Sequence, residues 1–286
     1  MEPTPAAETN RLVKVYTDFW GRPRVHALTG LDLVIHTGEI FGLLGPNGSG
    51  KTTTMKLLLG LLHPTRGTVK VLGRPADDVQ KNREIGYLPE ESYLYPFLTG
   101  EETLRFYGRL FGLRGRELDR RVSDLLDLVR LDVRARKRTL KEYSKGMSRR
   151  IGLAQALIND PKFVLLDEPT TGLDPVGTRE IKDLIISMKA QGRTVLMSSH
   201  LLADVEDVCD RIAILVRGQM RELGSVKELL LVRDIMQLRA RNVSPELTAA
   251  AGKLLADSGA TDVEISHPRM TLEELFLRVI AEDRSN

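Results

Sequence analysis

The sequence predicts an α/β fold built on a parallel-containing sheet, and three observations support this prediction. Short apolar runs of strand length recur along the chain, and stretches with helical periodicity separate many of them. One of the apolar runs leads directly into a glycine-rich loop and then a helix. Strands that alternate with helices form sheets whose ligands gather at the carboxyl ends of the strands. Polar residues that follow these runs are therefore the candidates for a functional site.

The amino-terminal third is predicted to be rich in strands. Weak alternation of apolar and polar side chains marks the first segment, and the later ones are short apolar runs. The predicted strands before residue 100 are 12–16, 31–35, 40–44, 68–72 and 85–88. The last of them ends at Pro89 and Glu90.

The glycine-rich loop is the most informative motif. Its residues are, in order, Gly45, Pro46, Asn47, Gly48, Ser49, Gly50, Lys51, Thr52 and Thr53. Glycines let the backbone turn consecutive N–H groups toward phosphate oxygens, and the helix that follows presents the positive end of its dipole to the same anion. Lys51 is expected to neutralise the β- and γ-phosphates, and the Thr52 hydroxyl to ligate Mg²⁺. The motif predicts a site for a nucleoside triphosphate rather than a plain glycine-rich turn.

The middle of the chain is predicted to be helical from Gly100 to about residue 160. The apolar faces expected there are Leu104, Tyr107, Leu110 and Phe111, and then Val122, Leu125, Leu126 and Val129. Residues 105–150 hold 12 Arg and 3 Lys against 6 acidic residues, a net charge of +9. This basic segment is either a solvated helical face or a surface for an anionic partner, such as lipid head groups or nucleic acid.

Two later strands end in ionisable residues. Residues 163–166 form a buried-type strand followed by Asp167 and Glu168, and residues 194–197 form another that ends shortly before His200. A buried pair of carboxylates is costly without cations, so the alternative is an ordinary strand-end turn with exposed acids. A nucleotide-bound Mg²⁺ removes that cost, because Asp167 can hold the metal while Glu168 polarises the attacking water. His200 reaches the same sheet edge, where its imidazole can contact the γ-phosphate.

The remaining elements follow the same logic. A helix is expected around residues 179–189, and a strand at 212–216 is followed by Gly218 and Gly224, which are expected to end this part. Beyond residue 225 we expect a small appended α/β unit. Its predicted strands are 236–239 and 262–266, and its predicted helices are 244–257 and 271–282.

Composition argues against several classes of protein. The longest apolar runs are far too short to cross a bilayer, and residues 1–10 have neither a basic start nor an apolar signal region, so neither a membrane span nor secretion is expected. The single cysteine, Cys209, excludes an internal disulfide and fits a reducing compartment. Cys209 lies in a predicted helix, where we interpret it as a small buried apolar residue rather than a catalytic thiol.

These motifs, taken in order, resemble those of nucleotide-binding subunits of the ATP-binding cassette (ABC) family, over residues 11 to about 225. The phosphate loop matches, and residues 163–168 match the second nucleotide motif, which makes Glu168 the counterpart of the family's catalytic glutamate. Residues 171–174 match the D-loop, so Asp174 is expected among the nucleotide-contacting residues. His200 matches the family's switch histidine.

The family's signature motif is partly preserved. Tyr143-Ser144-Lys145-Gly146-Met147 stands where the family usually reads L-S-G-G-Q, so Ser144 and Gly146 carry over, whereas Lys145 and Met147 depart from the pattern. In the family this motif caps the ATP that the opposite subunit holds, so the resemblance implies a dimer. The helix that begins here can present its amino end to the γ-phosphate.

Two further positions are open. The family stacks an aromatic ring on adenine near the amino terminus, where Tyr16 is the better match and Trp20 competes. Glu90 stands where the family usually has glutamine, and because a carboxylate only accepts hydrogen bonds, whether it copies the glutamine's contact with magnesium is left open. A Glu at this place together with Ser-Lys-Gly-Met resembles cassettes of bacterial exporters whose membrane subunit is a separate chain.

The resemblance implies a P-loop NTPase cassette over residues 1–225, with a mixed, mostly parallel core sheet, an amino-terminal antiparallel β part and a helical insert at about 91–160. Residues 226–286 would form a small C-terminal α/β accessory domain. The implied function is Mg²⁺-dependent ATP hydrolysis by a homodimer or heterodimer on the cytoplasmic face of the membrane. It would power export through separate transmembrane permease subunits. These subunits would dock on the basic insert and the loop after Glu90.

Two other functions are weighed against this one. A soluble cassette ATPase that acts on ribosomes or DNA is kept open by the basic segment, but such family members usually carry two cassettes or a long coiled coil, and this sequence shows neither. Nucleic acid is therefore not the expected partner. A regulatory module that binds ATP without hydrolysing it is disfavoured by the presence of both Glu168 and His200. The transported substrate is not encoded in such a subunit.

Overall fold

The computed structural model describes residues 5–231, 242–259 and 261. Contacts divide the chain into two compact units, Met1–Leu229 and Leu230–Asn286. In the second unit the structure describes the helix α8 (Pro245–Asp257), which Ser244 caps by accepting a hydrogen bond from the Leu247 N–H at 3.3 Å. The strands expected at 236–239 and 262–266 and the helix expected at 271–282 lie outside the described residues.

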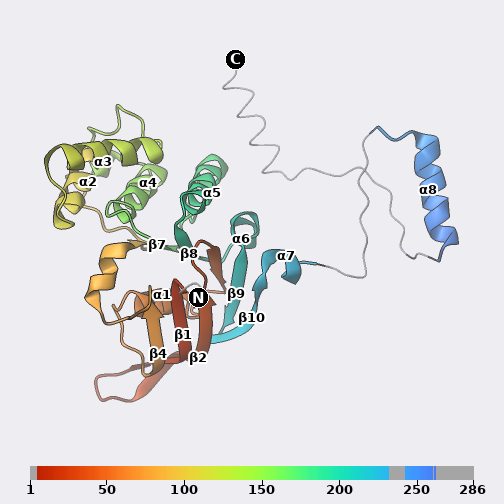
Figure 1. Ribbon diagram of the computed structural model, residues 1–286, viewed down its shortest axis with the longest axis horizontal. Coiled ribbons are helices and arrows are strands. Elements are labelled where there is room, and N and C mark those ends of the chain that lie inside the picture. Colours follow the sequence, from red (N-terminus) through yellow and green to blue (C-terminus); the bar gives the residue numbers. More distant parts are fainter. Residues whose placement is uncertain (1–4, 232–241, 260, 262–286) are drawn as a thin grey trace. The chain divides into compact units, whose positions relative to one another are not determined.

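A six-stranded sheet organises the first unit (Figure 1), with the strand order β10-β9-β3-β8-β7-β6. Its strands are β3 (Ile40–Leu44), β6 (Ile85–Leu88), β7 (Phe163–Asp167), β8 (Thr194–Ser199), β9 (Arg211–Val216) and β10 (Gln219–Ser225). All neighbours pair in parallel except β10, which runs antiparallel to β9. The predicted α/β class with a mixed, mostly parallel sheet is confirmed.

The strand β10 corrects the sequence prediction, which ended this part of the chain at Gly218. Arg217 and Gly218 both have positive φ, at 50° and 75°. Two consecutive residues of this kind form a tight hairpin turn whose twist matches the flanking strands. The chain therefore reverses at Gly218 and returns as β10, rather than leaving the sheet.

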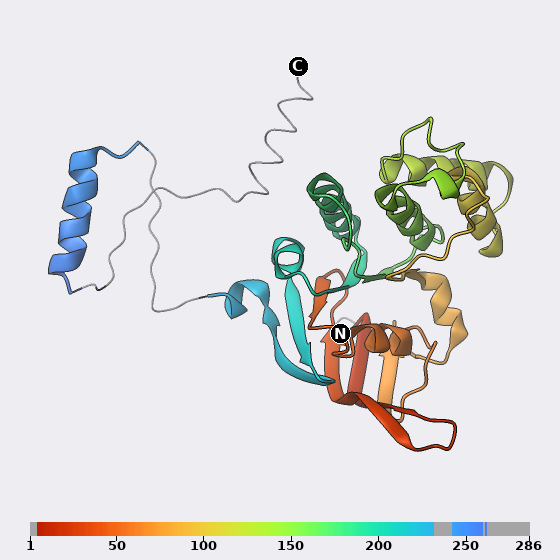
Figure 2. The same ribbon diagram turned by 180° about the vertical axis from the view of Figure 1, so that it is seen from behind.

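A second sheet, with the order β2-β1-β4-β5, is entirely antiparallel and forms the expected amino-terminal β part. Its strands are β1 (Ala7–Thr17), β2 (Pro23–Ile35), β4 (Arg66–Val71) and β5 (Arg74–Pro75). β2 begins eight residues before the predicted strand 31–35, because its ladder with β1 continues through exposed residues to the pair Thr17 and Pro23. Figure 2 shows the resulting hairpin projecting from the sheet.

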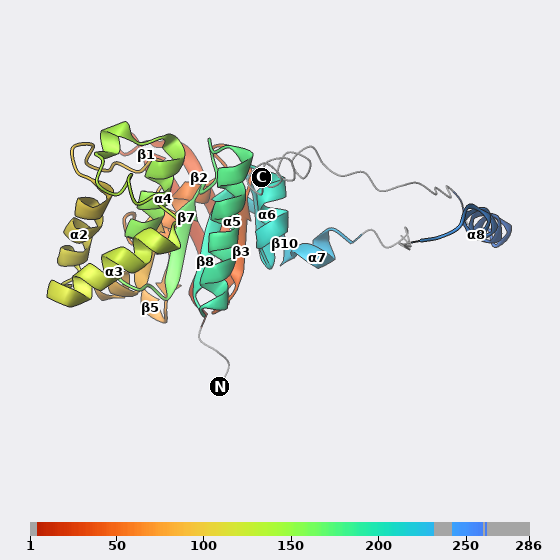
Figure 3. The same ribbon diagram turned by 90° about the horizontal axis from the view of Figure 1, so that it is seen from above.

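Alternation of side chains along the central strand builds two hydrophobic layers. Phe41 and Leu43 pack with the helix α1 (Lys51–Leu58) and the antiparallel sheet, whereas Ile40 and Leu44 belong to the core on the opposite face. That second core includes α5 (Pro175–Ala190) and α6 (Leu202–Val208), which lie along the same side of the sheet (Figure 3). Strands covered on both faces explain the continuous apolar runs in the sequence.

The helical insert contains α2 (Gly100–Leu110), α3 (Gly115–Leu128) and α4 (Lys145–Ala156). The predicted face of Val122, Leu125, Leu126 and Val129 is buried, as expected. The other predicted face is only partly correct, because Leu104 is buried whereas Leu110 and Phe111 are 68% and 45% exposed. Helical periodicity alone could not show that the end of α2 leaves the core.

Cys209 lies one residue beyond the end of α6, not within a helix as predicted. Its side chain is buried, and burial raises the pKa of the thiol well above its usual value. The interpretation of Cys209 as a buried apolar residue, rather than a reactive thiol, agrees with this environment because only the thiolate is nucleophilic.

Candidate active site

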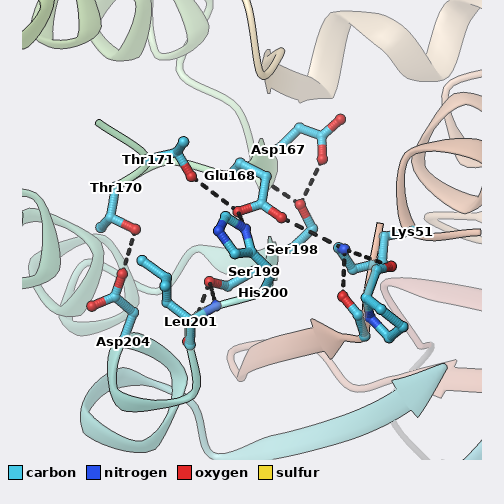
Figure 4. Close-up of polar contacts among 12 residues, drawn as sticks. Lys51, Asp167, Glu168, Thr170, Thr171, Ser198, Ser199, His200, Leu201 and Asp204 are labelled. Atoms are coloured by element: carbon cyan, nitrogen blue, oxygen red, sulfur yellow. Dashed lines mark hydrogen bonds and ion pairs between the residues drawn. The ribbon is translucent and has the colours of Figure 1, made fainter. Parts of the chain in front are cut away.

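The candidate site lies at the carboxyl ends of β3, β7 and β8. β8 lies between β3 and β7 in the sheet, so the residues that follow these three strands meet although the chain visits them far apart. Figure 4 shows the side chains of Lys51, Glu168 and His200 pointing toward one another across the end of β8.

The phosphate loop connects the end of β3 to the start of α1. Gly45 and Gly50 have φ of 150° and 108°, a region that side chains with a Cβ rarely adopt. A Cβ on Gly45 would lie 2.2 Å from the Leu215 carbonyl oxygen, and one on Gly50 would lie 2.7 Å from that of Ala27. Glycine is therefore required at both positions, by conformation and by space. Pro46, Asn47 and Gly48 are exposed at the tip of the loop.

Lys51 joins the phosphate loop to β7. Its buried ammonium donates hydrogen bonds to the carbonyl oxygens of Gly45, at 2.6 Å, and Pro46, at 3.4 Å. The same nitrogen lies 3.6 Å from Glu168 Oε1. A positive charge is thus held at the mouth of the glycine loop, where the motif predicts phosphates.

Asp167 carries a buried oxygen that no described residue satisfies. Its side chain is 1% exposed, and Oδ1 accepts a hydrogen bond from Ser198 Oγ at 2.5 Å, whereas the buried Oδ2 has no hydrogen-bond partner among the described residues. An unpaired buried carboxylate oxygen is costly, and oxygen ligands are those that Mg²⁺ prefers. The donors Asp167 and half-buried Thr52 therefore fit this ion.

Glu168 is held from several sides. It is 4% exposed, and its Oε2 lies 2.8 Å from His200 Nδ1 and accepts a hydrogen bond from Thr171 Oγ1 at 3.1 Å. Because an ionised carboxylate only accepts, Nδ1 of His200 carries the proton in this contact. The backbone of Glu168 is in the left-handed region, with φ of 50°, and its N–H donates to Ser198 Oγ at 3.0 Å.

The two candidates for adenine stacking have different surroundings. The Tyr16 hydroxyl lies 3.4 Å from Thr53 Oγ1, so the ring stands beside the phosphate loop. Trp20 is 76% exposed in the hairpin between β1 and β2, and packs edge-to-face on Phe19 with ring centroids 5.5 Å apart. Tyr16 stays the predicted stacking residue.

Replacement of Tyr16 by alanine is therefore expected to weaken ATP binding by about 1 to 3 kcal/mol, the range found when a stacked base loses its aromatic partner. Trp20→Ala is the matched control and should leave the dissociation constant for ATP unchanged. Titration of both variants with ATP tests the assignment. A larger loss of affinity in Trp20→Ala would show that the hairpin folds over the base.

Other predicted residues are not brought to this cluster. Ser144 caps α4, with its Oγ accepting a hydrogen bond from the Met147 N–H at 3.2 Å, and Gly146 lies in the first turn of the same helix. Asp174 caps α5 by accepting from the Gly177 N–H at 2.7 Å. Glu90 follows β6, and its side chain is exposed.

Sequence reasoning missed several supporting residues. Ser198 bonds both Asp167 and Glu168, and its signal was its position at the end of the apolar strand β8. Thr170 Oγ1 donates to Asp204 at 2.5 Å, and Asp204 pairs with the buried Lys182 at 2.9 Å. This chain of contacts ties the turn after Glu168 to α6, which begins shortly after His200, but no local pattern in the sequence marks it.

Fold and site together define a phosphate-loop nucleotide-binding cassette. The sequence model described as ABC transporter matches residues 28–171. An uncharacterized ABC transporter ATP-binding protein of Synechocystis sp. is 49% identical over 225 residues, which cover 78% of this chain and 64% of that protein. A Nod factor export ATP-binding protein I of Cupriavidus pinatubonensis is 35% identical over 275 residues, which cover 87% of this chain and 84% of that protein. The chain belongs to the ABC transporter family, as its motifs predicted.

Solved structures support the same class. An ATP-binding cassette in a dimeric post-hydrolysis state with bound ADP and phosphate matches with a TM-score of 0.71 and 26% identity, over 77% of this chain and 98% of that one. The cbiO1 protein of Clostridium perfringens, part of the ABC transporter complex cbiONQ, matches with a TM-score of 0.71 and 25% identity. The match covers 89% of this chain and 97% of that one. The chain spans slightly less than two thirds of the Synechocystis relative's length.

Proposed function

We propose that this chain hydrolyses Mg²⁺-ATP as the ATP-binding subunit of an ABC exporter whose transmembrane subunits are separate chains. The observation that carries the proposal is the convergence of Lys51, Glu168 and His200 at one sheet edge beside the phosphate loop. The export part is supported by the similarity to Nod factor export ATP-binding proteins of several bacteria.

In the proposed reaction, the loop N–H groups and Lys51 hold the phosphates, with Tyr16 against the adenine. Thr52 and Asp167 would hold Mg²⁺, which supplies neutralising charge on the phosphates. Glu168 orients the attacking water and accepts its proton, and His200 fixes the carboxylate through Nδ1. When the Lys51 ammonium binds a phosphate oxygen, it no longer pairs with Glu168. The Glu168 carboxylate can then accept a hydrogen bond from the attacking water.

Hydrolysis itself has a direct test. The purified chain is expected to release phosphate from ATP when Mg²⁺ is present and to stop when EDTA removes the metal ion. Continued hydrolysis in EDTA would contradict the role of the Asp167 oxygens.

We further propose that two copies of the chain act together. Ser144 and Gly146 lie at the amino end of α4, away from the Lys51 cluster, where Ser144 is exposed. A second copy brought against this end would place its γ-phosphate at a helix amino terminus, which favours anions. Asp174 would line the same interface, and Glu90 would take the place of the family's glutamine at the sheet edge. The dimeric state of the similar cassette supports this arrangement.

The membrane partner is proposed to dock on the helical insert. A cavity of about 860 Å³ opens there, and its lining includes Arg83, Leu110, Phe111, Leu113, Arg120 and Ile158. The exposed apolar side chains at the end of α2 are thus part of this lining. Aromatic residues of the loop after Glu90 are exposed close to α2, where Tyr95 stacks edge-to-face on Phe106 with ring centroids 5.7 Å apart.

Phe111→Glu is expected to abolish co-purification with a transmembrane subunit of the proposed exporter when the two are co-expressed, because a charge would be placed on the proposed apolar contact. Trp20→Glu, which changes an exposed aromatic residue of the β1–β2 hairpin, is the matched control. Both variants should hydrolyse ATP in isolation as the wild type does. Retention of the membrane protein by Phe111→Glu would rule out this face.

The alternative of a nucleic-acid partner receives little support from the basic segment. Five of its arginines form ion pairs with carboxylates of the chain, and they are Arg105, Arg121, Arg136, Arg138 and Arg150. Charges already paired in this way attract phosphates less strongly.

Among the described residues no helix is both long and apolar enough to span a membrane. We propose a peripheral position on the cytoplasmic face, with the second unit as an accessory domain.

A further inference from the structure

Arg149 is a buried arginine on α4 whose hydrogen bonds all go to main-chain carbonyls. Its side chain is only 6% exposed, and a guanidinium has five N–H donors. Nε donates to the Pro169 carbonyl at 3.0 Å. Nη1 donates to the carbonyls of Pro89 and Glu90, at 2.7 and 2.9 Å. Nη2 donates to the carbonyls of Asp167, at 2.6 Å, and Glu168. Five donors meet five carbonyls, so the buried group is fully satisfied.

These carbonyls lie where two neighbouring strands stop pairing. The parallel ladder between β6 and β7 ends at the pair Leu88 and Leu166. Beyond it, the carbonyls that follow β6 and those at the end of β7 are joined by the guanidinium of Arg149 instead of by each other. Arg149 therefore connects the segment that carries Glu90 to the segment that carries Glu168.

Two glycines allow α4 to approach closely enough for this contact. A Cβ on Gly86 in β6 would lie 2.1 Å from the Ala156 carbonyl oxygen in α4, and a Cβ on Gly152 would lie 2.8 Å from Leu88 Cδ1. Helix and strand thus pack with no room for larger residues. Arg149 lies one turn before Gly152 on the same face of the helix, which directs its side chain to the strand ends.

The backbone of Glu168 requires such support. A non-glycine residue at φ of 50° is uncommon, and it persists where the surrounding structure holds it. Both backbone polar groups of Glu168 are held: its N–H donates to Ser198 Oγ, and its carbonyl accepts from Arg149 Nη2 and, at 3.3 Å, from the Thr171 N–H. Without Arg149 this carbonyl would keep only the long turn bond from Thr171, which would let the turn relax and move the carboxylate away from Lys51.

We propose that Arg149 is a positioning residue for hydrolysis, which fixes the backbone of Glu168 so that its carboxylate faces the phosphate loop. This inference rests on the proposed role of Glu168. Arg149 has no hydrogen bond or ion pair with the phosphate loop, so its contribution falls on turnover and not on ATP affinity.

Arg149→Lys and Arg149→Gln keep a polar side chain but cannot reproduce the five-donor fork. Both are expected to bind ATP as the wild type does and to lose about 10- to 100-fold in kcat, as misplaced catalytic groups do. Arg150→Lys is the matched control, because Arg150 donates to the carbonyls of Val129 and Arg130 and pairs with Glu180, away from the site. Its kcat should stay near wild type.

A double-mutant cycle separates positioning from a general structural defect. Single-turnover hydrolysis is measured with enzyme in excess over ATP for the wild type, Arg149→Lys, Glu168→Gln and the double variant, beside thermal unfolding. If Arg149 acts through Glu168, Arg149→Lys slows the Glu168→Gln protein by less than about twofold, since coupled residues are not additive.

Equal slowing in both backgrounds, an unchanged kcat, or failure of both Arg149 variants to fold would each overturn the inference and leave Arg149 as a packing residue. A Glu168→Gln protein that hydrolyses at the wild-type rate would instead reject the proposed role of Glu168. A slow Glu168→Gln protein with a fully active Arg149→Lys protein would reject the role of Arg149 alone.

Discussion

Glu168→Gln is expected to bind ATP with affinity close to that of the wild type and to hydrolyse it about 10²- to 10⁴-fold more slowly, the usual contribution of a general base. Glutamine keeps the shape of the side chain and can still accept a hydrogen bond, but it cannot take the proton of the attacking water. Loss of the carboxylate also frees Lys51, now 3.6 Å from Glu168 Oε1, for the phosphates. Phosphate release and an ATP titration on the same preparation measure the two effects.

The same variant tests the proposed dimer, because unhydrolysed ATP keeps its γ-phosphate in place. Size-exclusion chromatography should show Glu168→Gln shifting toward a dimer with ATP and not with ADP. Adding Ser144→Arg places a bulky side chain at the exposed start of α4 and should remove the shift. If the Glu168→Gln protein turns over ATP as fast as the wild type, Glu168 is not the catalytic carboxylate, and Glu90 is the next candidate.

Lys51→Ala is expected to lower ATP affinity by roughly tenfold or more and to abolish turnover, since a hydrogen bond to a charged group contributes about 1.5 to 3 kcal/mol. The variant also leaves the buried Glu168 carboxylate without its cation, so negative charge would face the incoming phosphates. Nucleotide titration measures the loss. Lys56→Ala is the control, because Lys56 is exposed near the end of the same helix. If Lys51→Ala bound ATP with wild-type affinity, residues 45–53 would not be the phosphate-binding loop.

Local pattern was sufficient where one segment carries both its structure and its chemistry. The apolar run of β3, the glycines that tolerate positive φ and the helix that begins at Lys51 are contiguous, so they could be predicted together. Asp167 and Glu168 were equally predictable, because a fully buried strand places the residues at its end on the ligand edge.

Local pattern was insufficient where burial depends on neighbours distant in sequence. Leu110 and Phe111 have helical spacing from the buried Leu104 but leave the core. The return of the chain as β10 depended on the turn at Gly218, whose glycine alone is equally consistent with a loop.

The sequence by itself determined the α/β class, the phosphate loop, the acidic strand end and membership of the ABC transporter family, because each depends on short contiguous motifs and on their order along the chain. Only the tertiary structure decided that Glu168 lies between Lys51 and His200, and that Arg149, one of 12 arginines in residues 105–150, reaches the backbone of this site. The physical reason is the strand order. β8 stands between β3 and β7, so Lys51 and Glu168, more than one hundred positions apart, meet through the topology of the sheet. α4 packs against β6, which brings Arg149 to the ends of β6 and β7.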